Sequence, residues 1–188
     1  MICIDTPGFG DSEGRDPDHI DNIVSSLKTI GFVNTFIITW NCLENRFSEQ
    51  LDSTIRLLSQ IFSSDFFSNV LICFTKFAHD KKSVSLLKKG KNLEKDQWVH
   101  QMQDQFKNRY GCSLKKNQFC FIDNSVFGEM EELEMVEIAE FENCMEDILE
   151  FTMKSKPFIC KDIKSVLNEI DELKQILAGL IVQFDSEF

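Results

Sequence analysis

The strongest constraint on the fold of this chain is a regular alternation of short apolar runs with longer segments of helical periodicity. The runs that read as strands cover residues 2–5, 32–40, 69–77 and 118–123. The segments that read as helices begin near residues 16, 48, 94, 136 and 161. This order favours a parallel sheet with right-handed crossovers. We therefore predict an α/β fold with three layers, in which helices cover both faces of a parallel sheet.

Length and composition indicate one main domain. The chain has 188 residues, of which 43% are hydrophobic, enough for one well-buried core and too few for two ordinary domains. We expect this domain to span residues 1–155. An amphipathic helical segment over residues 156–188 should follow it.

The charge balance narrows the possible partners. A formal net charge of -11 disfavours binding to nucleic acid or to anionic membranes, because both require a positive face. The chain has no charged-then-apolar leader and no run of about 18 apolar residues, so we expect no transmembrane segment and a cytoplasmic protein. None of the seven cysteines forms a C-x-x-C pair, and Cys3, Cys73 and Cys120 fall within runs predicted to be buried strands. Reduced thiols that pack as small apolar side chains are expected.

Polar residues follow three of the predicted strands. Asp5-Thr6-Pro7-Gly8 ends the first strand, Thr75-Lys76 the third, and Asp123-Asn124-Ser125 the fourth. Functional loops of parallel sheets gather at the carboxyl ends of the strands, so these groups should lie at one edge.

Each group has chemistry that suits a nucleotide site. Asp5 can hold a magnesium ion, usually through water, while Gly8 allows a backbone N–H to approach a phosphate. The aliphatic stem of Lys76, which follows Thr75, can lie along a purine ring. The amide of Asn124 offers both a donor and an acceptor to a base edge.

Taken in order, the motifs DTPGFGD, FTK and IDNS resemble those of the AIG-type GTPases, the group that includes the immunity-associated GIMAP proteins and is related to the chloroplast-import Toc receptors. The segment NRFSEQLDSTIRLLSQIF between the first two motifs supports the resemblance. DTPGFGD also looks like septins, but the A-K-x-D base motif of septins is not matched.

The resemblance implies a P-loop GTPase-like fold, GTP or GDP as the bound nucleotide, and slow hydrolysis that is often coupled to self-assembly. It implies that Asp5 is the magnesium-linked residue. Gly8, Thr75, Lys76 and Asn124 would contact the nucleotide by the same resemblance.

The chain also departs from the family pattern. These residues contain no G-x-x-x-x-G-K-[ST] loop, whose backbone N–H groups and lysine would hold the phosphates, and the strand that carries this loop is missing with it. Ala78 stands where the guanine-reading aspartate of the [NT]-K-x-D motif is expected. We therefore expect weak or undetectable GTP binding, and no catalytic residue can be assigned.

Three functional hypotheses stay open. The chain can be the downstream part of a competent GTPase, a pseudo-GTPase that acts as an interaction module, or an unrelated enzyme that uses cysteine or histidine. At the residue level, the stretch Asp5 to Gly8 can be only a turn that ends a strand. Lys76 can be simply solvated, and Asn124 can cap a turn. Residues 76–95, which are rich in lysine, can be a solvated insertion or a site for an anion or a partner.

The carboxyl-terminal segment has the apolar spacing of a coiled-coil seam. The positions that alternate by three and four are Ile163, Val166, Ile170, Leu173, Leu177, Leu180 and Phe184. Leu167, Ile176 and Ile181 widen this stripe, which favours docking on the chain's own domain. Self-association or a helical partner bound through Ile163–Phe184 is the alternative.

The missing strand predicts an unusual sheet. An open gap would leave buried N–H and C=O groups unpaired, at roughly 1 to 3 kcal/mol for each group. We expect either that residues 2–5 pair directly with residues 33–39, or that residues 2–5 stay loosely held until another segment supplies the strand.

Overall fold

The computed structural model describes residues 2–6, 16–42, 49–77, 95–123, 135–161 and 163. The chain divides into two compact units. Unit 1 comprises Met1–Val33, Glu49–Ser63 and Ile159–Phe188, and unit 2 comprises Asn34–Ser48 and Ser64–Phe158. The predicted helical seam beyond Ile163 lies outside the described residues.

Unit 1 contains two of the predicted helices. Helix α1 (Asp16–Ile30) buries Ile20, Val24 and Leu27 on one face, as its periodicity predicts. Gly31 ends the helix in a left-handed conformation with φ of 89°, and its N–H donates to the carbonyl of Leu27 at 2.8 Å. Strand β1 (Phe32–Val33) follows and forms a two-stranded sheet with β5 (Phe158–Ile159).

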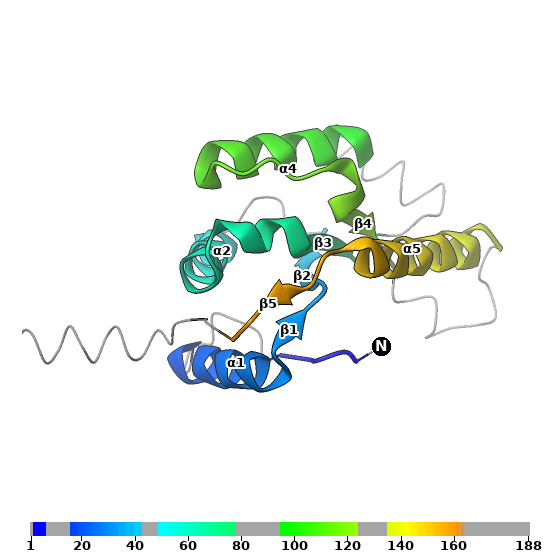
Figure 1. Ribbon diagram of the computed structural model, residues 1–188. Helices are drawn as coiled ribbons and strands as arrows, with labels where there is room; N and C mark the ends of the chain where they lie inside the picture. Colours follow the sequence, from blue (N-terminus) through cyan, green and yellow to red (C-terminus); the bar gives the residue numbers. More distant parts are fainter. Residues whose placement is uncertain are drawn as a thin grey trace, which may run out of the picture. The chain divides into compact units, whose positions relative to one another are not determined.

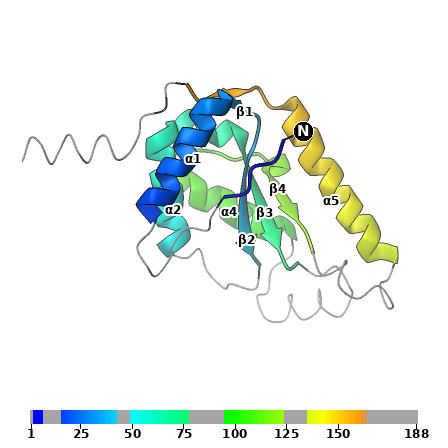
Figure 2. The same ribbon diagram turned by 90° about the horizontal axis from the view of Figure 1, so that it is seen from below.

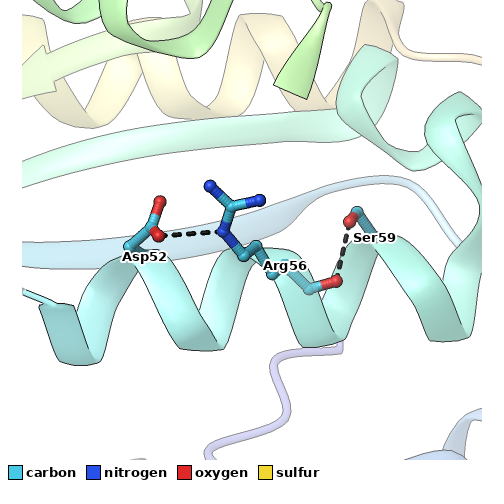
Figure 3. A network of polar contacts seen from close by, with 3 residues as sticks. All are labelled: Asp52, Arg56 and Ser59. Atoms are coloured by element: carbon cyan, nitrogen blue, oxygen red, sulfur yellow. Dashed lines mark hydrogen bonds and ion pairs between the residues drawn. The ribbon is translucent and has the colours of Figure 1, made fainter. Parts of the chain in front are cut away.

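Helix α2 (Glu49–Phe62) is the second described helix of unit 1 and matches the helix predicted to begin near residue 48. Its buried side chains include Ile55, which is fully enclosed. Figure 3 shows the polar contacts of this helix: Arg56 Nε donates to Asp52 Oδ2 at 2.9 Å, and Ser59 Oγ donates to the carbonyl of Arg56. These contacts span three or four residues within one helix, so they support the helix itself.

Unit 2 is built on a parallel sheet of three strands, β2 (Phe36–Asn41), β3 (Val70–Thr75) and β4 (Phe119–Phe121). The order is β2-β3-β4, and the strands run side by side in Figure 2. Phe36 pairs with Val70, and Ile72 pairs with Phe119. Short 3₁₀ helices η1 (Ser64–Asn69) and η2 (Lys116–Gln118) lead into β3 and β4. The predicted α/β class with a parallel sheet is confirmed.

Helix α4 (Lys95–Tyr110; Figure 1) packs on one face of this sheet through aromatic rings. The ring of Trp98 meets that of Phe74 edge-on at 5.3 Å, and Phe74 stacks on Phe121 at 4.8 Å. The ring of Phe106, also on α4, meets the ring of Phe67 of η1 edge-on, with 6.1 Å between the ring centroids. Gly111 ends the helix with φ of 68°. Interlocking rings of this size bury a large apolar area on this face of the sheet.

Helix α5 (Met135–Lys154) covers the opposite face of the sheet. The residues buried there alternate with those of the aromatic face, as the pleat of a strand requires. They are Leu71, Cys73, Cys120, Ile122, Cys144 and Phe151, with Phe141, Met145 and Ile148 packed against them. Helices on both faces of the sheet therefore match the prediction.

One predicted strand is wrong, and another is divided in two. Residues 2–6 form no strand, and all five are exposed, including Cys3, which was expected to be buried. A run of four residues offers few backbone hydrogen bonds, so its apolar composition does not by itself make it a strand. Of the two alternatives, direct pairing of residues 2–5 with residues 33–39 is therefore wrong, and a loosely held segment stays a prediction. The run 32–40 divides at Asn34-Thr35 into β1 and β2, which belong to different units.

Candidate functional site

The strongest site candidate in unit 2 is the carboxyl edge of its sheet. Because all three strands are parallel, their carboxyl ends meet there. Asn41 at the end of β2 pairs with Thr75 at the end of β3. Beyond β4, the N–H of Ile122 donates to the carbonyl of Phe74 at 2.8 Å, and the N–H of Phe77 donates to the carbonyl of Ile122 at 3.2 Å. Backbone bonds thus continue past the formal ends of the strands.

Lys76 has the most unusual backbone at this edge. Its φ is 57°, in the left-handed region that non-glycine residues seldom adopt. Cys42 fixes the peptides on either side of this residue, since its N–H donates to the Thr75 carbonyl at 3.0 Å and its Sγ donates to the Lys76 carbonyl at 2.9 Å. The Lys76 side chain is exposed. A buried thiol therefore helps to hold an exposed cation in a strained conformation.

Two further polar residues lie at the same edge. The Thr75 hydroxyl donates to the Trp40 carbonyl at 3.3 Å, which links β3 to β2 through a side chain. Asp123 follows β4 and is buried. Carboxylates are seldom buried without polar contacts, and Asp123 has interactions of this kind. Thr75 and Asp123 thus stabilise the edge on which Lys76 is displayed.

A second cation lies near these residues. Lys95, the first residue of α4, places its Nζ 5.2 Å from the ring centre of Phe77 and 5.6 Å from that of Phe121. The same ammonium contacts Glu140 of α5 at 3.3 Å. Lys95 is distant in sequence from the predicted site residues, and its cation–π contacts depend on the fold. Only its place in a lysine-rich stretch could have pointed to it from sequence.

The structure places only part of the predicted site together. Thr75 and Lys76 lie at the carboxyl edge as expected. Asp5 is exposed within unit 1, in a segment without strand structure. Gly8 and Asn124 lie outside the described residues.

The described residues were also searched for grouped metal ligands and for helices able to span a membrane. Among those residues, no three histidine, cysteine or acidic side chains are grouped in a way that could hold a metal ion. Within the same ranges, no helix has both the length and the apolar character needed to cross a bilayer. A magnesium ion bound through a single carboxylate, with the rest of its shell supplied by phosphate and water, is not covered by the first finding.

No protein-family model matches the chain, and its comparison with curated proteins yields no significant match. The fold and the site define an α/β protein whose parallel sheet carries an exposed, strained lysine at its carboxyl edge.

Proposed function

We propose that this chain is part of a guanine-nucleotide-binding protein of the AIG type, and that the carboxyl edge of unit 2 contacts the base. The observation that carries the proposal is the conformation of Lys76. A left-handed non-glycine residue costs about 1 to 2 kcal/mol, and such strain persists where the surroundings enforce it, often at functional sites. Here Cys42 and Phe77 supply hydrogen bonds on either side of the strained residue.

The chemistry of the edge suits a purine. With its backbone held, Lys76 presents an aliphatic stem that can lie along a ring, while its ammonium remains in solvent. Lys95 adds a second positive charge close to the ends of β3 and β4. The Lys95 ammonium is ion-paired with Glu140, so Lys76 is the cation that this edge offers to an anionic ligand.

By the sequence resemblance alone, Asp5 of unit 1 would hold a magnesium ion. This carboxylate is exposed, and Mg²⁺ is commonly held by one or two carboxylates together with phosphate oxygens and water. When bound, the ion neutralises charge on the phosphates. Gly8 and Asn124 would complete the nucleotide contacts, as the sequence resemblance implies.

The test is a titration of the isotope-labelled chain with GTP and Mg²⁺, followed through backbone amide chemical shifts. We expect binding with a dissociation constant on the order of 1 mM, or about -4 kcal/mol, because the family's phosphate loop is not among these residues. The amides of Thr75 to Phe77 and Asp123 should shift most. Lys76→Ala should weaken the binding several-fold, whereas Lys107→Ala, which removes an exposed lysine of α4, should leave it unchanged.

Two results would contradict the proposal. One is the absence of shifts around Lys76 at GTP concentrations well above the expected dissociation constant. The other is an equal effect of Lys76→Ala and Lys107→Ala, which would indicate that GTP responds only to net charge. ATP serves as the ligand control, since a base contact should distinguish the two purines or at least shift different amides.

A second candidate function is an interaction module that binds no nucleotide. It is favoured by the exposed apolar side chains Ile138, Leu149 and Met153 on α5. Single exposed apolar residues are common, but three on one helix form a feature that proteins often use for contacts. If this reading holds, the Leu149→Lys, Met153→Lys double variant should lower self-association in sedimentation velocity, while GTP should shift no amides.

A further inference from the structure

One face of strand β2 in unit 2 is exposed. Ile37 of β2 pairs with Leu71 of β3, and Thr39 pairs with Cys73. Both β3 residues are buried beneath α5, so their β2 partners lie on the same face of the sheet. Ile37 is nevertheless 46% exposed, whereas Trp40, on the opposite face of the same strand, is only 7% exposed. Parallel strands are usually buried on both faces, so the α5 face of β2 lacks a cover in the described structure.

The width of a single helix explains this exposure. Helix α5 packs on β3 and β4 through Cys144 and Phe151, and Figure 2 shows it on the β4 side of the sheet. With its side chains an α-helix is about 10 to 12 Å wide, while neighbouring strands are about 4.8 Å apart, so one helix covers about two strands. Strand β2 is the third strand and lies on the far side of β3. Covering it requires a second helix beside α5.

The flank of α5 that borders β2 is also apolar. Thr35, which directly precedes β2, donates from its hydroxyl to that of Thr152 on α5 at 3.0 Å, and this contact identifies the flank. Leu149 lies one helical turn before Thr152 and is 37% exposed. Met153 lies one turn after Leu149 and is more exposed still. The apolar strip between strand and helix, called the β2–α5 strip below, consists of Ile37, Thr39, Leu149 and Met153.

Negative charge borders the β2–α5 strip. Glu146 and Glu142 lie one and two turns before Leu149 on α5, and both are exposed. Two other glutamates of this helix, Glu140 and Glu150, form ion pairs with lysines. Within the described ranges, neither Glu142 nor Glu146 has a lysine or arginine partner. The strip therefore combines exposed apolar side chains with carboxylates that have no counter-charge there.

We propose that the β2–α5 strip binds an amphipathic helix of a partner protein. Its apolar residues pack against Ile37 and Leu149, and its lysine or arginine residues lie opposite Glu142 and Glu146. Helices are the elements that cover the faces of parallel sheets, and a second helix packs beside α5 at an interaxial distance of about 8 to 10 Å. Apolar anchors at positions i, i+3, i+4 and i+7 cover such a strip. The proposal does not depend on nucleotide binding, because Lys76 lies at the carboxyl edge of the sheet.

Charge favours a basic partner over two other occupants. A second copy of this chain, whose net charge is -11, brings like charges together at the interface, which opposes association. The predicted seam over residues 163–184 is also poorly matched, because acidic residues outnumber lysines in it. Its charged residues are Lys164, Glu169, Asp171, Glu172 and Lys174. A helix with basic residues beside its apolar stripe neutralises the glutamates that border the strip.

The test uses two synthetic peptides of about five helical turns, each with leucines along one side of the helix. The other positions alternate between lysine and alanine in the first peptide, and between glutamate and alanine in the second. Each peptide is titrated into the isotope-labelled full chain, and backbone amide shifts are followed by NMR. We expect the lysine peptide to shift the amides of Ile37, Thr39 and Leu149. The glutamate peptide should bind about tenfold more weakly, because its charges face Glu142 and Glu146.

Substitutions distinguish the strip from the general charge of α5. Ile37→Lys should weaken binding of the lysine peptide about tenfold, as expected for a central apolar anchor. Ile159→Lys, at an exposed isoleucine outside the strip, should leave it unchanged. The Glu142→Gln, Glu146→Gln double variant should weaken binding about threefold and reduce its dependence on salt. Asp147→Asn, on another side of α5, is the control for charge and should have no effect.

Circular dichroism establishes whether each variant is folded, and the shift map of the unchanged chain is decisive where a variant is not. The proposal is overturned if neither peptide binds, if both bind equally, or if the shifted amides lie outside the strip. A dimer in sedimentation velocity that Ile37→Lys dissociates would assign the strip to a second copy and overturn it as well. So would a shift of the strip amides in the Leu173→Asp, Leu177→Asp double variant without peptide, because the chain's own segment would then occupy the strip.

Discussion

The two ends of the sheet in unit 2 are built differently. At the amino end, two buried amide side chains bind backbone carbonyls of neighbouring segments. Gln118 Nε2 donates to the carbonyls of Phe67 and Val70 at 2.8 and 2.7 Å, and its Oε1 accepts from the Lys115 N–H. Asn69 Nδ2 donates to the carbonyls of Asn34 and Lys156, both at 2.7 Å.

At the carboxyl end the side chains serve other purposes. Lys76 is exposed in a left-handed conformation, and its backbone is held by Cys42. Thr75 is only half-buried. The amino end thus stabilises the strands, while the carboxyl end accepts conformational strain and displays charge. The hydrogen bonds thus distinguish an end that is closed by buried amides from an end that leaves a strained lysine exposed.

The largest effect should come from Gln118→Ala. The change leaves two carbonyls and one N–H without their partner, and each buried unsatisfied group costs about 1 to 3 kcal/mol, so we expect a loss of about 2 to 4 kcal/mol in the free energy of unfolding. Urea titration followed by circular dichroism measures this loss. Asn117→Ala, at the exposed neighbouring position, is the matched control. Equal effects of the two changes would remove the distinction between the ends.

Asn69→Ala should have the next largest effect. It removes the donor shared by the carbonyls of Asn34 and Lys156, which predicts a loss of about 2 kcal/mol. The same urea titration applies, with Ser68→Ala at the exposed neighbouring position as the control. If Asn69→Ala leaves the free energy of unfolding unchanged, water must bind both carbonyls in the variant, and the amino end of the sheet is open to solvent.

At the carboxyl end, Lys76→Gly should stabilise the protein slightly. Glycine adopts a positive φ without steric cost, so we expect a gain of about 0.5 to 1 kcal/mol after its greater entropy in the unfolded state is subtracted. Lys107→Gly, within α4, should instead cost about 1 kcal/mol. Thermal unfolding measures both changes. A loss of stability in Lys76→Gly would show that the lysine side chain contributes more than its backbone strain costs.

The smallest effect concerns an exposed ion pair close to the amino end. Lys116 Nζ lies 2.7 Å from Asp96 Oδ1, and the hydrogen bond and charge of Lys116 lower the pKa of Asp96. A lowered carboxyl pKa stabilises the fold above the unfolded-state value, and that contribution is lost as pH falls through the folded-state value. A carboxyl titration by NMR should show a pKa for Asp96 below 3.8 that rises in Lys116→Ala. Stability at neutral pH should hardly change, since both groups are exposed.

The helices of the described residues and most of the sheet could be predicted from the sequence. The apolar stripe of α1 and the β-branched run of β3 have periods that local chemistry enforces, so their positions could be predicted closely. The run Ile2–Asp5 could not be assigned in this way. Its composition suits a strand, but a strand exists only through its partners, and sequence does not name them.

The site was less predictable than the fold. The position of Lys76 after β3 follows from the apolar run before it, whereas its positive φ depends on Cys42, which is 34 residues away. The roles of Asn69 and Gln118 also depend on partners that are distant in sequence. Polar residues next to strands are usually predicted to form turns, and only the fold shows which carbonyls these two amides bind. Cys144 joined Cys120 only through the packing of α5.

The double hydrogen bond of Asn69 has a mechanical consequence. The chain first enters unit 2 at Asn34 and last leaves it at Phe158. The carbonyls that accept hydrogen bonds from Asn69 belong to Asn34 and Lys156, at or next to these two points. A single amide therefore ties together the places where a pull along the chain would enter and leave the unit. Force applied along the chain would load the β1–β5 pair first and then these two bonds, before it reaches the strands of the three-stranded sheet.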